Sequence, residues 1–158
     1  MKLNRLKIFD VWRLRILIEK SLVEFDYYSE QKLAKVRSQH QIPSLLKACI
    51  DSRRIIYTTK EGSKIVGYLI GHNQAEQSFS LDWLYIEPKY RGQGLAKALL
   101  EKLEQDLSAR GLVKIELISY NAGRYYQRLG YQFVSKIKVD NQLTVEQYQK
   151  GIKGESRA

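Results

Sequence analysis

The sequence is poor in cysteine and histidine, and these shortages exclude several classes of protein. Cys49 is its only cysteine, so no internal disulfide can form, and two histidines beside it are too few for a Cys/His zinc cluster. No apolar run approaches the roughly 20 residues of a membrane span. The N-terminal stretch has charges among its apolar residues and no small-residue cleavage site, unlike a signal peptide. These absences predict a soluble, cytoplasmic protein with no metal and no membrane partner.

Linker sequence is also scarce. The 158 residues contain two prolines and no Gly/Ser-rich stretch, so nothing marks an internal domain boundary. Apolar residues make up 44% of the chain, which is enough for a hydrophobic core. We therefore expect one domain over 1–149, followed by a polar tail over 150–158.

Acidic residues are too few to balance the basic ones. The net charge is +10, and residues 1–60 carry +7 of it, with 13 Lys and Arg against 6 Asp and Glu. A nucleic-acid partner, an anionic ligand and simple solubility each explain such an excess. Because the charge lies on segments with helical periodicity, we favour a solvated helix face and leave a nucleic-acid partner open.

The hydrophobic periodicity predicts an α/β protein. The strand at 78–86, the helix after it and the strand at 112–119 have the length of a crossover unit, so these two strands should be parallel neighbours in a mixed sheet. Asp10 is the expected N-cap of the first helix. Helices are predicted over 11–24, 30–38, 43–51, 95–110 and 121–129, and strands over 3–9, 54–59, 64–72, 78–86, 112–119, 133–139 and 143–148.

The most informative segment joins a strand to the clearest helix of the chain and reads YIEPKYRGQGLAKA over 85–98. Its glycines permit positive φ angles, and the amides at a helix N-terminus point outward together with the positive end of the helix dipole. This arrangement suits a phosphate or pyrophosphate. Neither the G-x-G-x-x-G fingerprint nor the P-loop pattern is present, which disfavours the common nucleotide-binding folds.

Two blocks of the sequence resemble the GCN5-related N-acetyltransferase (GNAT) superfamily. The segment 91–96 (RGQGLA) is similar to its R/Q-x-x-G-x-G/A motif, and 121–131 (NAGRYYQRLGY) is similar to its downstream N-x-x-A-x-x-x-Y-x-x-x-G-F/Y block. The resemblance implies a mostly antiparallel sheet flanked by helices, with one parallel strand pair splayed around an acyl-coenzyme A site. It also implies that acetyl-CoA is the acyl donor and that its pyrophosphate is held by Arg91, Gly92, Gln93, Gly94, Leu95 and Ala96.

The same resemblance assigns chemical roles to individual residues. Tyr126 matches the tyrosine that protonates the coenzyme A thiolate, and Asp82 matches the acidic position that takes a proton from the amine, with Glu116 as its alternative. Asp82 should share a sheet face with apolar neighbours, which would raise the pKa of its carboxyl. A main-chain amide of Leu84, Tyr85 or Ile86 would hold the thioester carbonyl, and Asn121 would contact the coenzyme arm or cap its helix.

The sequence does not identify the molecule that accepts the acetyl group. The resemblance implies acetyl transfer to a primary amine of a small molecule or protein by direct attack in a ternary complex. Acidic and aromatic residues over 24–30 could attract a cationic amine, in a pocket formed with the last hairpin. Two other functions stay open: a coenzyme A-binding sensor without turnover, and a nucleic-acid-associated acyltransferase using the basic N-terminal face. An oligomer, if there is one, would be a dimer.

Overall fold

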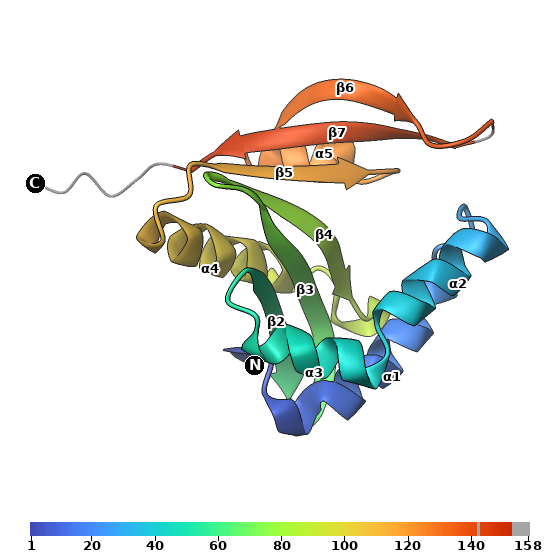
Figure 1. Ribbon diagram of the computed structural model, residues 1–158, viewed down its shortest axis with the longest axis vertical. Coiled ribbons are helices and arrows are strands. Elements are labelled where there is room, and N and C mark those ends of the chain that lie inside the picture. Colours follow the sequence, from blue (N-terminus) through green and yellow to red (C-terminus); the bar gives the residue numbers. More distant parts are fainter. Residues whose placement is uncertain (142, 153–158) are drawn as a thin grey trace, which may run out of the picture. The chain divides into compact units, whose positions relative to one another are not determined.

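Seven strands of the described chain form one sheet in the order β1-β2-β3-β4-β5-β7-β6 (Figure 1). The computed structural model describes residues 1–141 and 143–152. The strands are β1 (Lys2–Arg5), β2 (Arg54–Glu61), β3 (Lys64–Ala75), β4 (Ser78–Ile86), β5 (Lys114–Ser119), β6 (Gln132–Lys138) and β7 (Thr144–Gly151). The helices are η1 (Ile8–Asp10), α1 (Val11–Leu22), α2 (Glu30–Gln39), α3 (Ile42–Ile50), η2 (Pro88–Tyr90), α4 (Leu95–Ala109) and α5 (Gly123–Arg128).

The predicted mixed sheet is confirmed by the strand pairing. β4 and β5 are parallel, whereas β1 with β2, β5 with β7 and β6 with β7 are antiparallel. The parallel pairing joins Ser78–Leu81 to Lys114–Leu117, and β4 then continues to Ile86. β7 reaches Gly151, three residues beyond the predicted strand end, and Gln142 of the predicted hairpin turn lies outside the described residues.

The chain forms two compact units that share β3, β4 and α4. The first contains Met1–Ile70 and Trp83–Leu99, and the second contains Gly71–Asp82 and the described residues after Leu99. Each unit has its own buried residues and is described separately below. The first unit contains the glycine loop, and the second contains Asp82 and the segment around Tyr126.

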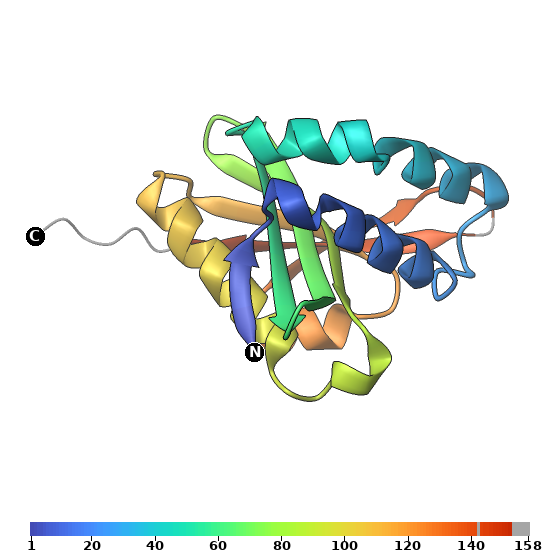
Figure 2. The same ribbon diagram turned by 90° about the horizontal axis from the view of Figure 1, so that it is seen from below.

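Helix α1 forms the core of the first unit as its periodicity predicts. Its predicted inward face is between 0% and 3% exposed and packs with side chains of α3, β2 and β3. Figure 2 shows α1 and α3 side by side. Apolar burial on this scale is the main favourable term in folding, at about 25 cal/mol per Å². The face consists of Val11, Leu14, Leu17, Ile18 and Leu22.

The N-terminal strand prediction is wrong over its second half. β1 ends at Arg5, and Ile8 and Phe9 lie in the short helix η1 with their side chains exposed. Leu6 is still buried, and its amide donates to the Ile56 carbonyl at 2.8 Å. The chain turns after this contact because Asp10 is drawn inward, where its side chain is almost wholly covered.

Asp10 occupies the N-cap position of α1 but does not cap the helix with its side chain. Its carboxylate instead accepts hydrogen bonds from Arg13 (3.0 Å) and from Lys60 on β2. Burial alone would raise the pKa of this carboxyl, but the two cations outweigh it and lower the pKa below its ordinary value. The residue therefore joins the start of α1 to the sheet.

We expect Asp10→Asn to lower the free energy of unfolding by about 3 kcal/mol, because Lys60 would lose the counter-charge of a buried ion pair. Denaturant unfolding at pH 7 measures this, with Asp51→Asn as the control, since Asp51 pairs with an Arg53 side chain that is largely exposed. The folded-state pKa of Asp10 is depressed, so its contribution is complete above the unfolded pKa of about 3.9 and disappears as the pH falls through the folded pKa. A difference between wild type and Asp10→Asn that did not shrink as the pH falls below about 3.9 would contradict this account.

Helix α4 ends just before a glycine, as its sequence predicts. Gly111 has φ of +79°, its amide donates to the Ser108 carbonyl at 3.0 Å, and the Leu112 amide donates to the Leu107 carbonyl at 3.0 Å. This pair of bonds is a Schellman motif with glycine at C′. The chain thus leaves α4 in a defined direction and enters β5.

Helix α5 starts two residues later than predicted and is not capped by Asn121. Its N-cap is Ala122, and the Ala122 amide donates to the Ser119 hydroxyl at 2.9 Å. Gly123 opens the helix beside the Tyr148 ring, where a Cβ atom would lie 2.0 Å from the tyrosine hydroxyl. Only glycine fits this close approach, so it keeps α5 next to β7.

Candidate active site

The glycine loop between β4 and α4 adopts the conformation that its sequence predicts. Gly92 and Gly94 both have φ of +76°, in the left-handed region that favours glycine. A Cβ atom built at either residue meets no atom within 4 Å, so both face open space. Among the described residues, none accepts a hydrogen bond from the amides of Gly92, Gln93, Gly94 or Leu95.

These features fit the pyrophosphate of a coenzyme. Unpaired amides at the start of a 15-residue helix combine hydrogen-bond donors with the positive end of the helix dipole. Leu95 and Ala96 begin that helix, and the Ala98 amide already donates to the Gly94 carbonyl at 3.0 Å. The amides from Gly92 to Leu95 thus form a continuous group of donors.

The Arg91 side chain is bonded to other groups of the protein. Its Nε donates to the Ile86 carbonyl at 2.8 Å, and its terminal nitrogen donates to Glu24 at 2.5 Å. The guanidinium also lies 5.5 Å from the centre of the Tyr85 ring, a cation–π distance. Arg91 therefore fastens the start of the glycine loop to the end of β4, and its contact with a phosphate stays a prediction.

Glu24 belongs to the acidic and aromatic segment 24–30, which was expected to attract a cationic amine. Its carboxylate accepts hydrogen bonds from Arg91 and from the Tyr85 hydroxyl, each at 2.5 Å. Burial acts to raise the pKa of Glu24, but these donors lower it overall; burial and the carboxylate raise the pKa of Tyr85. Glu24 is thus engaged in positioning Arg91. Around it, Phe25 and Trp83 pack in an aromatic cluster with ring centres 5.4 Å apart.

The end of β4 supplies the segment expected to hold the thioester carbonyl. Tyr85 and Ile86 are buried, and Leu84 is half-buried. The Glu87 amide donates to the Val66 carbonyl at 2.8 Å, which ties the end of β4 to β3. The strand is therefore fixed on its β3 side, while the assignment of a carbonyl-binding amide stays a prediction.

Asp82 has different surroundings from those expected. Instead of lying among apolar side chains, it is exposed and accepts hydrogen bonds from the Ser80 hydroxyl at 2.9 Å and the His72 Nδ1 at 2.7 Å. No motif surrounds His72, so the sequence did not single it out. The one feature that pointed to it was its strand, which could pair with the strand that carries Asp82. A carboxylate bonded to one imidazole nitrogen orients the ring and leaves the other nitrogen to act as an acceptor.

Tyr126 is buried in the second unit within a group of aromatic rings. Its ring makes edge-to-face contacts with Tyr125 (5.5 Å between centres) and Tyr131 (5.6 Å), and a tilted contact with Tyr148 (6.4 Å). Burial, and secondarily Tyr125, raise the pKa of Tyr126 far above its ordinary value. Within the described chain no side chain bonds to its hydroxyl, so the phenol retains its proton and has that proton free to donate.

Asn121 and Glu116 complete the predicted set in the second unit. Asn121 is exposed and lines an open hollow of about 690 Å³ with Glu146 and Tyr148. Glu116 on β5 pairs with Lys114 at 3.0 Å. The structure brings Asp82 together with His72, and Arg91 with Glu24, whereas the roles proposed for these residues in catalysis stay predictions.

The fold and the glycine loop define an acetyltransferase domain, and the comparison with known families agrees. Residues 24–152 match the model of the acetyltransferase (GNAT) domain. Because this match covers most of the chain, the protein belongs to the GNAT acetyltransferase family, as the two sequence blocks predict.

Several solved structures share the fold of this chain at low sequence identity. A PaiA N-acetyltransferase from Thermoplasma acidophilum in complex with coenzyme A is 19% identical, with a TM-score of 0.76 over 92% of this chain and 96% of that one. An aminoglycoside 6'-N-acetyltransferase complexed with coenzyme A is 16% identical, with a TM-score of 0.75 over 98% and 99%. A GNAT-family acetyltransferase from Streptococcus pneumoniae is 16% identical, with a TM-score of 0.74 over 96% and 99%.

Across residues 1–141 and 143–152, no three His, Cys, Asp or Glu side chains come together as a metal ion would require. No helix in that same part of the chain is long and apolar enough to cross a membrane.

Proposed function

We propose that this protein transfers an acetyl group from acetyl-CoA to a primary amine, by direct attack of the amine in a ternary complex. The observation that carries the proposal is the loop at Gly92 and Gly94, where two left-handed glycines present unpaired amides in front of α4. Membership of the GNAT family supports the same donor. When bound, acetyl-CoA supplies an activated thioester.

The residues of the second unit supply the acid–base chemistry in this proposal. An amine acceptor with an ordinary pKa near 10 is protonated at neutral pH and must lose a proton before it attacks. Asp82 orients the His72 ring through Nδ1, so the pair can accept that proton at Nε2 of the imidazole. Ser80 holds the other carboxylate oxygen and keeps Asp82 in place.

Tyr126 supplies the proton at the other end of the reaction. A leaving thiolate is stabilised when a nearby acid protonates it, and a phenol with a raised pKa stays in its acidic form throughout the useful pH range. A main-chain amide of Leu84, Tyr85 or Ile86 would polarise the thioester carbonyl, as an oxyanion-hole donor does. Asn121 would contact the coenzyme arm.

The experiment that tests coenzyme binding is a thermal shift with acetyl-CoA on Gly94→Glu and on Gly62→Glu. Both glycines have positive φ and no atom within 4 Å of a built Cβ, so both variants introduce similar backbone strain. Only Gly94→Glu places a carboxylate in the loop expected to hold the pyrophosphate. At about 100 times the dissociation constant, acetyl-CoA should stabilise wild type by about 2.7 kcal/mol, a shift of several degrees.

We expect wild type and Gly62→Glu to show this shift and Gly94→Glu to lose it. No shift in wild type would refute acetyl-CoA binding. A shift that Gly94→Glu retained would remove the loop from the binding site. Thiol release with a panel of amines then separates an enzyme from a coenzyme sensor, since a sensor binds acetyl-CoA and turns over none of them.

A further inference from the structure

Helix α1 has a second apolar face, on the side opposite the core. Phe9 just before the helix and Trp12 and Ile16 within it are 86%, 67% and 51% exposed, and Val23 just beyond it is 81% exposed. Their spacing of three, four and seven residues places them along one line of the helix. Large exposed apolar side chains in such an array mark interaction surfaces in folded proteins. We call these four residues the outer stripe.

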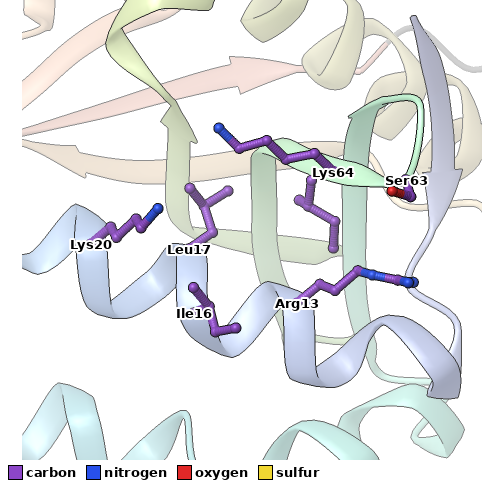
Figure 3. A pocket seen from close by; sticks show the side chains of 7 residues that line it. Arg13, Ile16, Leu17, Lys20, Ser63 and Lys64 are labelled. Carbon is purple, nitrogen blue, oxygen red and sulfur yellow. The ribbon is translucent and has the colours of Figure 1, made fainter.

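A hollow lies at the edge of the outer stripe. It has a volume of about 230 Å³ and lies between α1 and the turn that joins β2 to β3 (Figure 3). Ile16, Leu17 and Ile65 contribute its apolar lining, so Ile16 belongs to both the hollow and the stripe. Recognition sites commonly combine an apolar contact with a pocket that receives one anchoring side chain.

The surroundings of the hollow are positively charged. Arg13, Lys20 and Lys64 line it and reach around its apolar lining in Figure 3. The nearby carboxylates are already paired: Asp10 with Arg13 and Lys60, and Glu87 with Lys64 at 2.7 Å. Arg13 and Lys20 lie in the segment 1–60, which carries a net charge of +7, and Lys64 follows it. A partner with carboxylates around an apolar row would be complementary to it.

We propose that the outer stripe and the adjoining hollow bind an amphipathic helix of a partner protein, with acidic side chains flanking its apolar row. A second copy of this chain is disfavoured because a symmetric contact would place this positively charged patch against the same patch of the other copy. A membrane surface is disfavoured because it would leave the hollow unfilled.

The test uses synthetic peptides as probes, with fluorescence anisotropy as the readout. One peptide of about 18 residues, five helical turns, carries leucines at helical spacing flanked by glutamates, and its matched partner carries lysine in place of every glutamate. The variants are Trp12→Glu and Ile16→Glu. The control is Val113→Glu, because Val113 is 48% exposed and lies outside the patch. Circular dichroism confirms that each variant folds.

We expect the acidic peptide to bind wild type and Val113→Glu alike, with an affinity that falls as salt is added. Each stripe variant should weaken it about tenfold or more, and the basic peptide should not bind. Equal binding of both peptides, or of neither, would overturn the proposal. So would Trp12-dependent binding to phosphatidylglycerol vesicles in place of the peptide, which would indicate a membrane. A wild-type dimer that Ile16→Glu dissociates in sedimentation equilibrium would show that a second copy covers the stripe.

Discussion

Replacing Tyr126 with phenylalanine should lower kcat by about 10² or more while acetyl-CoA affinity stays within about twofold. The substitution removes only the hydroxyl and keeps the ring that packs against Tyr131 and Tyr148. Since within the described chain no side chain bonds to this hydroxyl, its loss leaves no protein group unpaired. The folded state should therefore survive, and the loss should fall on the step that releases the thiolate.

Tyr125→Phe is the matched control for that measurement. Tyr125 is the preceding residue of α5 and half-buried, and its ring lies 5.5 Å from that of Tyr126. We expect its removal to change kcat by no more than about threefold. Single-turnover kinetics and isothermal titration of coenzyme A separate chemistry from binding. Equal activity of wild type and Tyr126→Phe would remove this tyrosine from the mechanism.

The raised pKa of Tyr126 also predicts how kcat should depend on pH. Burial raises this pKa far above its ordinary value near 10, so the phenol should not ionise as the pH approaches 10. Any fall in the kcat of wild type near pH 10 should therefore also appear in Tyr126→Phe. A fall in wild type alone would mean that the hydroxyl is solvated in the working enzyme.

Local patterns were sufficient to predict most helices and the conformation of the glycine loop. The inward face of α1 follows from its 3.6-residue period, and all five of its predicted core residues are buried. Gly94 and Gly111 were identifiable because a positive φ angle is a property of the glycine and its immediate neighbours. Features of this kind depend on a few consecutive residues, which a single sequence displays directly.

Contacts between distant parts of the chain could not be predicted in the same way. Asp10 reads as an ordinary N-cap, but it pairs with Lys60, which is 50 residues away, and the strand before it ends early. Arg91 reads as a phosphate ligand, but Glu24, 67 residues away, accepts one of its hydrogen bonds. In both cases a charged side chain has local and distant partners available, and tertiary packing decides between them.

The surroundings of Asp82, the candidate base, also depend on contacts between distant parts of the chain. Strand periodicity places Asp82 next to Leu84 and Ile86 on one sheet face, which is why an apolar environment was expected. The hydrogen bond from His72 depends instead on how β3 pairs with β4, whereas Ser80 lies two residues before Asp82 on β4 itself. The sequence therefore identified the carboxylate but missed the imidazole bonded to it.

Asp82→Asn and His72→Gln should each lower kcat/KM by about 10²-fold at pH 7. If the two residues work as one unit, the double variant should lose little more than either single variant, because removing one partner already disables the other. Glu116→Gln is the matched comparison, since Glu116 is the alternative base and pairs only with Lys114 among the described contacts. A large loss in Glu116→Gln with normal activity in Asp82→Asn would transfer the role to Glu116.

The pH profile distinguishes a base from a residue that merely supports the fold. A base is needed only while the acceptor amine is protonated, so raising the pH towards the pKa of the amine, about 10.4 for a lysine-like acceptor, should restore the activity of Asp82→Asn. A structural defect would not respond in this way, because the lost packing is the same at every pH. An acceptor amine with a lower pKa should narrow the gap between wild type and variant already at pH 7. If the gap stayed constant from pH 6 to pH 10 with both amines, Asp82 and His72 would be positioning residues for the strand and not the proton acceptor.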